Sequence, residues 1–236
     1  GQPYINSITL NFYPNYEGAI SAFNRGDIEA LSAISPEKVS DIQGDKFFVQ
    51  RTALPRIFGV FFNTNQGPVF LNKEVRQALA LAVDRDEIID VALRGYGNAI
   101  DGPLPIGTLP ETKKMSSLTK EERSMEAADI LLRDGWKLNS QNILEKETKK
   151  EISLLKFSII TSNTEELSVI ANLLKEQWGK LGADIDVKIF EPGDLSQSIL
   201  RPRKYEALLF GEIIGRDLDL YAFWHSSQRN DPGLNI

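Results

Sequence analysis

Two strands and the helix between them constrain the fold more than any other part of this sequence. Ile152 to Thr161 is a strongly apolar run, which predicts a buried strand. A helix follows from Ser162 and ends at Leu181-Gly182, and Ala183 to Phe190 then alternates apolar and charged residues as a strand does. Strands joined in this way lie parallel with a right-handed crossover, so the unit predicts an α/β lobe. A short helix and a further strand complete that lobe, Asp194 to Leu200 and Tyr205 to Phe210.

A second informative stretch runs from Phe58 to Pro105. An aromatic-rich run up to Phe62 predicts a buried strand, and turn residues then lead to Asn72, a predicted helix N-cap. Apolar residues from Val75 to Val83 recur at helical spacing, and Asp84 with Glu87 predicts the capped start of another helix. Two glycine-containing turns end the stretch, Gly95-Tyr96-Gly97 and Gly102-Pro103-Leu104-Pro105.

Several separated motifs in this order resemble a known family. The motifs are VRQALALAVDRDEII from Val75, the GYG and GPLP turns, RKYEALL from Arg203, Asp217-Leu218-Asp219 and the aromatic run Tyr221 to Trp224. Together they resemble the extracytoplasmic solute-binding proteins of ABC importers, in the class that takes up peptides and nickel, family 5. The resemblance implies an α/β fold, a periplasmic-binding-protein-like (type II) lobe with a mixed sheet flanked by helices, plus a partial second lobe. It also implies an ABC permease as partner and hinge closure over a solute.

The resemblance also suggests how the chain is divided. Residues 1–62 are expected to be the C-terminal part of a first lobe, residues 63–215 the second lobe, and residues 216–236 a cleft segment that returns toward the first lobe. Family members are larger than this chain and carry a signal peptide or a lipidated cysteine, neither of which occurs here. We therefore expect the chain to be a piece of a protein that acts outside the cytoplasm, in the periplasm or on the outer face of the membrane.

Smaller elements are predicted on either side of the central stretch. Before it, we expect a helix from Tyr16 to Asn24 and a helix start at Ser35-Pro36. Strands are predicted at Ile5 to Phe12, Asp27 to Leu31 and Phe47 to Arg51. After it, Thr119 to Glu122 is a capping box on a helix that is expected to bury Met125, Ala128, Ile130, Leu131 and Leu132. Trp136 to Glu147 reads as a small hairpin.

Composition excludes several classes of function. The net charge of −6 and the interleaving of Lys146, Lys149 and Lys150 with glutamates argue against nucleic acid as a partner. With no cysteine, the chain has no disulfide and no thiolate chemistry, and a single histidine argues against a metal site. No apolar run approaches about 18 residues, the length that a membrane span needs. We therefore expect no metal and no cofactor.

Candidate binding residues gather near the C-terminal end. The resemblance places Gly211 to Asp217 at the cleft, where peptide-binding members carry an aromatic residue and, three residues later, an aspartate that holds the ligand's ammonium group. Those two positions fall on Gly211 and Ile214, and Glu212 is the nearest substitute carboxylate. Glu212 is also expected to face the cleft because it follows a predicted strand. The candidate ligand-binding residues are Glu212, Ile214, Asp217, Tyr221, Trp224 and Asn163, the last at a strand-to-helix turn.

Other functions stay open at this point. An α/β hydrolase or transferase that uses Asp217 and Glu212 is one, and a sensory or adaptor module on the same fold is another. Against an enzyme, neither Ser226 nor Ser227 beside His225 lies in a nucleophile-elbow motif, and no catalytic residue is predicted. Asp84 and Asp86 are expected to cap a helix rather than to act as an acid–base pair. The ligand can be a peptide, an oligosaccharide, a metal complex or another small solute.

Overall fold

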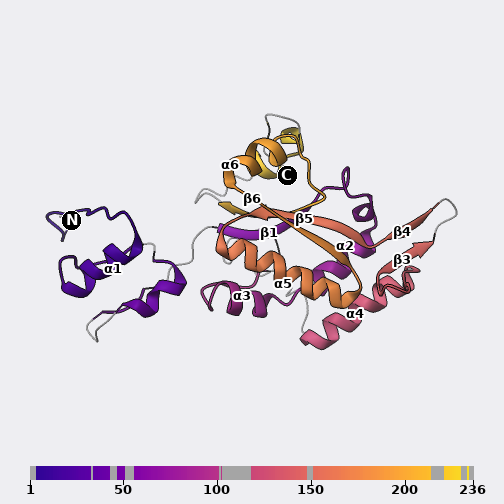
Figure 1. The fold of residues 1–236 in the computed structure, drawn as a ribbon, viewed down its shortest axis with the longest axis horizontal. Helices are drawn as coiled ribbons and strands as arrows, with labels where there is room; N and C mark the ends of the chain where they lie inside the picture. The colour runs from indigo at the N-terminus through magenta and orange to yellow at the C-terminus, as the bar shows by residue number, and fades with distance from the viewer. Residues whose placement is uncertain are drawn as a thin grey trace. The chain divides into compact units, whose positions relative to one another are not determined.

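The structure, a computed structural model, describes residues 4–32, 34–42, 47–50, 56–100, 102, 118–147, 151–213, 221–229 and 233. The chain divides into two compact units, Gly1–Ala53 and Leu54–Ile236. All the strands found in these described ranges belong to the larger unit (Figure 1). The fold of the larger unit therefore determines where the candidate site lies.

A four-stranded sheet forms the centre of the larger unit. Its order is β1 (Arg56–Phe62), β7 (Ala207–Ile213), β5 (Lys156–Ser162) and β6 (Asp184–Phe190). β7, β5 and β6 are parallel, and β1 pairs antiparallel with β7. The predicted strand–helix–strand unit is confirmed: β5, the helix α5 (Glu165–Leu181) and β6 give the parallel pair. All residues of β5 after Lys156 are buried, because the sheet is covered on both sides at this strand.

One side of the sheet, which we call the closed face, is covered by long helices. It carries alternate strand residues such as Phe157, Ile159 and Leu209, which join one buried cluster with Leu174 and Trp178 of α5. The helices α2 (Lys73–Leu81), α3 (Arg85–Ala92) and α4 (Lys120–Arg133) contribute to this cluster or pack at its border. Figure 1 shows α5, α2 and α3 together on one side of the sheet.

The helix caps predicted at Asn72, Asp84 and Thr119 are confirmed. Asn72 Oδ1 accepts from the backbone N–H groups of Glu74 and Val75, at 2.8 and 3.2 Å, and so starts α2. Asp84 Oδ1 accepts from the backbone N–H of Glu87 at 3.2 Å at the start of α3. Thr119 and Glu122 form both hydrogen bonds of a capping box on α4. Each cap satisfies N–H groups that a helix leaves without internal partners, which is why these polar residues fix the helix starts.

The inward face of α4 differs from the prediction. Ala127 and Leu131 are fully buried, whereas Met125 and Leu132 are each 63% exposed and Ala128 is exposed. Ala127 and Leu131 are four residues apart and share one helix face, so they set the rotation of α4 and turn Met125 and Leu132 outward. The run of apolar residues did not reveal this rotation.

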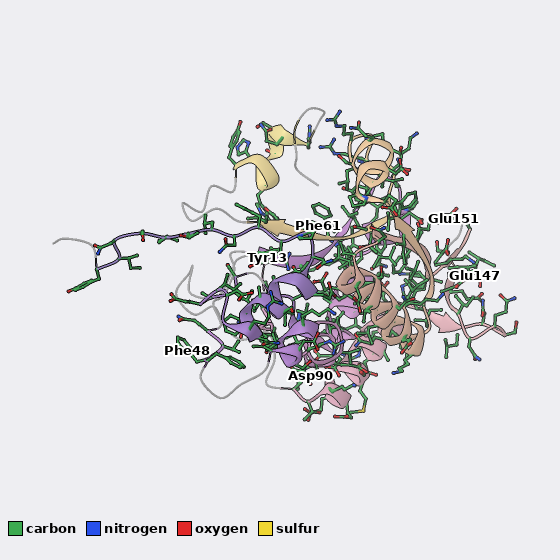
Figure 2. All side chains as sticks on the ribbon, turned by 60° about the vertical axis from the view of Figure 1, so that its left-hand side comes forward. Tyr13, Phe48, Phe61, Asp90, Glu147 and Glu151 are labelled. Carbon is green, nitrogen blue, oxygen red and sulfur yellow. The ribbon has the colours of Figure 1, made fainter. Side chains whose placement is uncertain are left out.

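A second, smaller sheet follows α4. It consists of β2 (Lys137–Leu138), β3 (Leu144–Glu147) and β4 (Ile152–Leu154), all antiparallel, and it confirms the predicted hairpin. The predicted strand from Ile152 is divided here, since β4 pairs with β3 while β5 belongs to the large sheet. Figure 2 shows Glu147 and Glu151 at the outer end of this hairpin, away from the large sheet.

The opposite side of the large sheet, which we call the α7 face, is covered by shorter pieces. The helices there are α6 (Pro192–Asp194), η3 (Leu195–Leu200), α7 (Tyr221–Trp224) and η4 (Ser226–Gln228). Leu195 of η3 forms a small buried cluster with Ile160, Tyr205 and Leu208. The predicted helix from Asp194 to Leu200 is present as α6 and η3 together. The sheet is thus covered unequally on its two sides.

The smaller unit has less regular structure than predicted. α1 (Tyr16–Arg25) is confirmed, with Asn15 as its N-cap and Gly26 in the left-handed conformation after it, and η1 (Pro36–Asp41) begins at the predicted Pro36. The predicted strands Ile5 to Phe12, Asp27 to Leu31 and Phe47 to Arg51 are wrong in their described residues, where no strand is assigned. Ile8 and Leu10 are each 75% exposed, because no neighbouring strand among the described residues pairs with this segment.

The boundary between the two units also differs from the expected limit at residue 62. The division falls after Ala53, and β1 is hydrogen-bonded throughout its length to β7 of the larger unit. After β1, Asn63 closes a turn by accepting from the backbone N–H of Gly67 at 2.9 Å, and η2 (Pro68–Leu71) leads to α2. The strand predicted to close the first segment is therefore an edge strand of the larger sheet.

Candidate functional site

Glu212 lies within a strand rather than after one. The sequence predicts that the last strand ends at Phe210, but β7 continues to Ile213 because β1 pairs with it over its full length. Glu212 is opposite Ile57 in this ladder, and only 3% of its surface is exposed. Its alternation with Leu208 and Phe210 places its side chain on the α7 face. The prediction that Glu212 follows the strand is corrected accordingly.

The carboxyl group of Glu212 has one hydrogen bond in the described part of the chain. The indole N–H of Trp224 donates to Glu212 Oε1 at 3.1 Å. Glu212 Oε2 is buried and has no hydrogen-bond partner among the described residues. Burial raises the pKa of Glu212, and the hydrogen bond from Trp224 only partly opposes that effect. The group is therefore easier to protonate than an exposed glutamate.

Trp224, which donates to this carboxyl group, also contacts a second aromatic ring. The rings of Trp224 and Phe61 have centroids 6.3 Å apart, and Phe61 lies on β1 opposite Leu208. Phe61 is labelled in Figure 2. Trp224 is 37% exposed and Tyr221 is 53% exposed. α7 thus presents two partly exposed aromatic side chains, and one of them, Trp224, is hydrogen-bonded to Glu212 near the C-terminal end of β7. Sequence reasoning named Tyr221 and Trp224 but missed Phe61, because the pairing of β1 with β7 has no local signal.

His225 takes part in a local hydrogen-bonded group with Ser227. Its Nδ1 accepts from the backbone N–H of Ser227 at 3.2 Å and lies 2.8 Å from Ser227 Oγ. The Tyr221 ring stacks on the imidazole with centroids 4.8 Å apart, and the Tyr221 hydroxyl is 3.0 Å from Ser227 Oγ. Hydrogen bonds with Ser227 and then Gln228 lower the pKa of Tyr221. These contacts cap the short helix η4, so His225 has a structural role here.

Asn163 lies at the same edge of the sheet as Glu212. It directly follows β5, which is the parallel neighbour of β7, so the carboxyl ends of both strands meet at this edge. Its backbone N–H donates to Phe190 O at 2.9 Å, and its side-chain Nδ2 donates to Glu191 Oε1 at 2.6 Å. Asn163 therefore joins the ends of β5 and β6. The N-cap of α5 is Thr164, which makes no side-chain capping hydrogen bond.

Two predicted site residues, Ile214 and Asp217, lie outside the described residues, as does Asp219. The other predicted acidic pair is placed away from the site. Asp84 caps α3 and also accepts from Lys120 Nζ at 2.6 Å, which ties α3 to α4. Burial alone would raise the pKa of Asp84, but hydrogen bonds from Lys120 and the Glu87 backbone hold it below its usual value. The expected structural role of Asp84 is confirmed.

A second acidic group, which sequence reasoning missed, has the same kind of role. Asp134 Oδ2 accepts from Asn72 Nδ2 at 2.5 Å, Lys146 Nζ at 2.7 Å and Trp136 Nε1 at 3.2 Å. Asp134 thereby connects α2, α4 and β3. Within the described ranges, no three His, Cys, Asp or Glu side chains gather in a way that would hold a metal ion. No helix in those ranges is long and apolar enough to cross a membrane.

Comparison with known proteins places the chain in a family. The family model described as bacterial extracellular solute-binding proteins, family 5 middle, matches residues 1–233. The oligopeptide-binding protein AppA of Bacillus subtilis is 27% identical over 238 residues, which cover 100% of this chain and 43% of AppA. The nickel-binding protein NikA of Staphylococcus aureus is 26% identical over 240 residues, which cover 100% of this chain and 44% of NikA. The chain spans less than half the length of these relatives.

Solved structures show the same fold. AppA from Bacillus subtilis in complex with a nonapeptide has a TM-score of 0.70 at 26% identity, over 94% of this chain and 44% of that chain. A nickel ABC transporter protein from Bacillus halodurans has a TM-score of 0.74 at 22% identity, over 95% of this chain and 45% of that chain. These likenesses confirm the predicted α/β fold of the periplasmic-binding-protein type. Since the family model covers almost every residue, the chain belongs to the bacterial extracellular solute-binding proteins of family 5.

Proposed function

We propose that this chain is part of a non-enzymatic solute-binding component of an ABC importer. In this proposal the whole protein captures a peptide or another small solute between two lobes and delivers it to a membrane permease. The observation that carries the proposal is the family match over residues 1–233, supported by relatives named for oligopeptide and nickel binding that align along the whole chain. The protein would act outside the cytoplasm, in the periplasm or attached to the outer face of the membrane.

The lobes are assigned from the family as part of the same proposal. With the limit moved from residue 62 to Ala53, the residues before Leu54 would be the C-terminal part of the first lobe. Residues from Leu54 to 215, which include β1, would be the second lobe, and residues 216–236 the cleft segment. The exposed apolar residues of the smaller unit support this assignment, since Ile8, Leu10 and Phe12 are 75%, 75% and 91% exposed. A segment with this pattern is stable only when another part of the lobe covers it.

The solute would meet the C-terminal edge of the large sheet. Tyr221 and Trp224 offer exposed aromatic surface there, which gives large contact area at little cost in side-chain entropy. Glu212 lies beneath Trp224, and Asn163 lies at the end of the neighbouring strand. Ile214 and Asp217 are kept in the proposed site because they lie between Glu212 and Tyr221 in the sequence. The Asn163–Glu191 hydrogen bond would have to open for the Asn163 amide to bind a solute.

The hydrolase or transferase alternative finds less support. It would use Glu212 as an acid or base, but Glu212 is only 3% exposed and is hydrogen-bonded to Trp224. General acid–base catalysis needs the group within hydrogen-bond reach of the substrate. The contacts of His225 with Ser227 lie within one short turn and serve to cap η4. The sensory-module alternative has no observation that favours it.

Calorimetry on the full-length protein tests the proposed function. The probes are mixed-sequence oligopeptides and a nickel–histidine complex, and the expected result is saturable binding of one of them without chemical change in the probe. Native mass spectrometry of the purified protein would show a retained solute. Turnover of the probe, measured by chromatography before and after incubation, would contradict the proposal, as would the absence of binding to every probe and of any retained solute.

A further inference from the structure

Glu212 and Trp224 form a pair in which the acid lies behind the aromatic ring. We propose that Glu212 is a positioning residue that fixes the indole of Trp224 as a flat wall for the solute, and not a charged anchor for a cationic solute. The positioning of Trp224 by Glu212 is a property of this chain alone, whereas the use of the ring as a wall for a solute rests on the proposed function.

The difference in burial between Glu212 and Trp224 distinguishes a positioning residue from a charged anchor. Glu212 is 3% exposed and Trp224 is 37% exposed, and the indole N–H donates to the carboxyl oxygen at 3.1 Å. A solute that approaches this edge therefore meets the ring before it meets the acid. To reach Glu212, an ammonium group would have to displace Trp224 and break its hydrogen bond, and the Trp224 indole N–H would then need another acceptor.

The surroundings of Glu212 favour a neutral carboxyl group. In the ladder Glu212 is opposite Ile57, and the rings of Phe61 and Trp224 lie on the same face. Among the described residues no Lys, Arg or His forms an ion pair with Glu212. Arg56, at the start of β1, instead places its guanidinium carbon 4.6 Å from the centroid of the Phe58 ring. A charged group in apolar surroundings without a partner is costly, so burial raises the pKa of Glu212.

A neutral carboxyl group can also make the Trp224 contact, with an oxygen that accepts more weakly than a carboxylate oxygen does. In that form the carbonyl oxygen would accept from the indole N–H, and the proton would lie on Oε2, the buried oxygen that has no partner among the described residues. The charge of Glu212 is thus not required for what the structure shows. What is required is an acceptor at this position, which a glutamine side chain also supplies.

The consequence for recognition is a solute class. A fixed indole face binds aromatic, apolar or planar groups by stacking and area burial. An anchor carboxylate would instead select solutes with a free ammonium group, since only an opposite charge offsets its burial. The pair therefore predicts that this part of the site contacts a solute through an aromatic or apolar portion, whatever holds the solute's charged ends.

Tryptophan fluorescence tests the positioning role without any solute. This chain contains three tryptophans, and Trp136 and Trp178 are 2% and 1% exposed, so iodide quenching within this chain reports mainly Trp224. In the full-length protein, other tryptophans can contribute to the fluorescence. Each variant is therefore also made with Trp224→Phe, and the quenching measured without Trp224 is subtracted from the quenching measured with it. Glu212→Leu removes the acceptor, and we expect it to raise Trp224 quenching roughly twofold as the ring leaves its place. Glu212→Gln supplies an acceptor again and should restore the quenching of the parent protein.

Two results would overturn the positioning role. One is unchanged Trp224 quenching in Glu212→Leu, which would mean that other contacts hold the ring. The other is the same increase in Glu212→Gln and Glu212→Leu, which would mean that the charge of Glu212 and not its acceptor fixes Trp224. Thermal unfolding of each variant confirms that it is folded, and Glu212→Met serves as a second apolar variant if Glu212→Leu is not.

Peptide binding tests the solute class in a separate arm. The probes are one oligopeptide with a free amino terminus and the same peptide with an acetylated amino terminus. We expect Glu212→Leu to weaken both by the same factor, because it acts through Trp224. Loss of affinity for the free-amine peptide alone, in Glu212→Gln or Glu212→Leu, would identify Glu212 as a charged anchor and overturn the proposal. If the parent protein binds neither peptide, the proposal that a peptide stacks on Trp224 is wrong. The quenching experiment still decides whether Glu212 positions Trp224.

Discussion

The two faces of the large sheet differ in how completely they are covered. The closed face is sealed by α5, α2 and α4, and residues such as Ile159, Leu174 and Trp178 are almost fully buried there. The α7 face has a small cluster around Leu195 and, beyond it, Glu212 beneath the partly exposed Trp224. The comparison indicates that the closed face stabilises the lobe, whereas the α7 face keeps a polar group and exposed rings at a cost in stability. Residues that a stable core would exclude are thus found where we propose the solute binds.

The largest expected effect comes from the closed face. Trp178 is 1% exposed, and the centroid of its ring is 5.7 Å from that of Phe157. Its Nε1 donates a hydrogen bond to Leu79 O at 2.9 Å. Trp178→Ala should lower the free energy of unfolding by about 3–5 kcal/mol, because it leaves a cavity and an unpaired carbonyl. Chemical denaturation measures the loss. The matched variant Trp224→Ala should cost well under half as much, and equal losses would end the distinction between the faces.

A smaller loss is expected at Asp84, which joins the helices of the closed face. Asp84→Ala removes the α3 cap and the contact with Lys120, and should cost about 2–3 kcal/mol at neutral pH. Asp84→Asn keeps a side chain that can cap the helix, so its effect isolates the contribution of the Asp84 charge. Because Lys120 is half exposed, added salt should weaken that contribution. The pKa of Asp84 is lowered in the folded state, so its stabilisation is present above the unfolded-state pKa and is lost as pH falls through the folded pKa. Asp84→Asn should therefore match the parent in acid, and a constant difference across pH would contradict the ion pair.

On the α7 face, Trp224→Phe should cost about 1 kcal/mol. The change keeps a ring over Phe61 but removes the indole N–H that donates to Glu212. Urea denaturation of Trp224→Phe and Trp178→Phe compares their free energies of unfolding. Trp178 also donates one hydrogen bond, but its side chain is buried. We expect Trp178→Phe to be the more damaging of the two. The reverse order would place the stabilising contacts on the α7 face.

The smallest effect concerns the pH dependence that Glu212 introduces. Burial raises the pKa of Glu212 in the folded state, so the folded state binds its proton more tightly than the unfolded state does. The free energy of unfolding should therefore fall as pH rises from the unfolded-state pKa through the folded one. Glu212→Gln should remove this fall while the contribution of Asp84 persists. Thermal unfolding at a series of pH values measures it, and parallel curves for the parent and Glu212→Gln would show that the Glu212 carboxyl does not titrate differently on folding.

Local signals explain what could be predicted from the sequence. Asn72, Asp84 and Thr119 start helices because their side chains bind N–H groups only two or three residues away. Gly182 ends α5 with a φ of 101°, a conformation in which a side chain is strained, and an added Cβ would lie 2.8 Å from Leu138 Cδ2. Such rules depend on residues that are close in the sequence, so one sequence is enough to apply them.

Pairings between distant residues explain what could not be predicted. The pairing of Ile57 with Glu212 carries β7 past its predicted end and buries the acid that was expected to follow the strand. In the smaller unit, Ile8 and Leu10 alternate as a strand would, but a strand exists only if another segment pairs with it, and none of the described residues does. The contact between Trp224 and Phe61 is of the same kind. Periodicity describes one segment and carries no information about its partner.

The place of β7 in the sheet determines when this lobe can form during synthesis. β7 lies between β1 and β5, yet it is the last of the four strands in the sequence. Until residues 207–213 have left the ribosome, β5 can pair only with β6, and β1 has no sheet partner. Contacts between segments so far apart make folding slow, because most of the chain must be ordered before they form. Until then the apolar strand Arg56–Phe62 stays without its ladder, and a nascent chain that ends before Ala207 should remain open to proteases and chaperones.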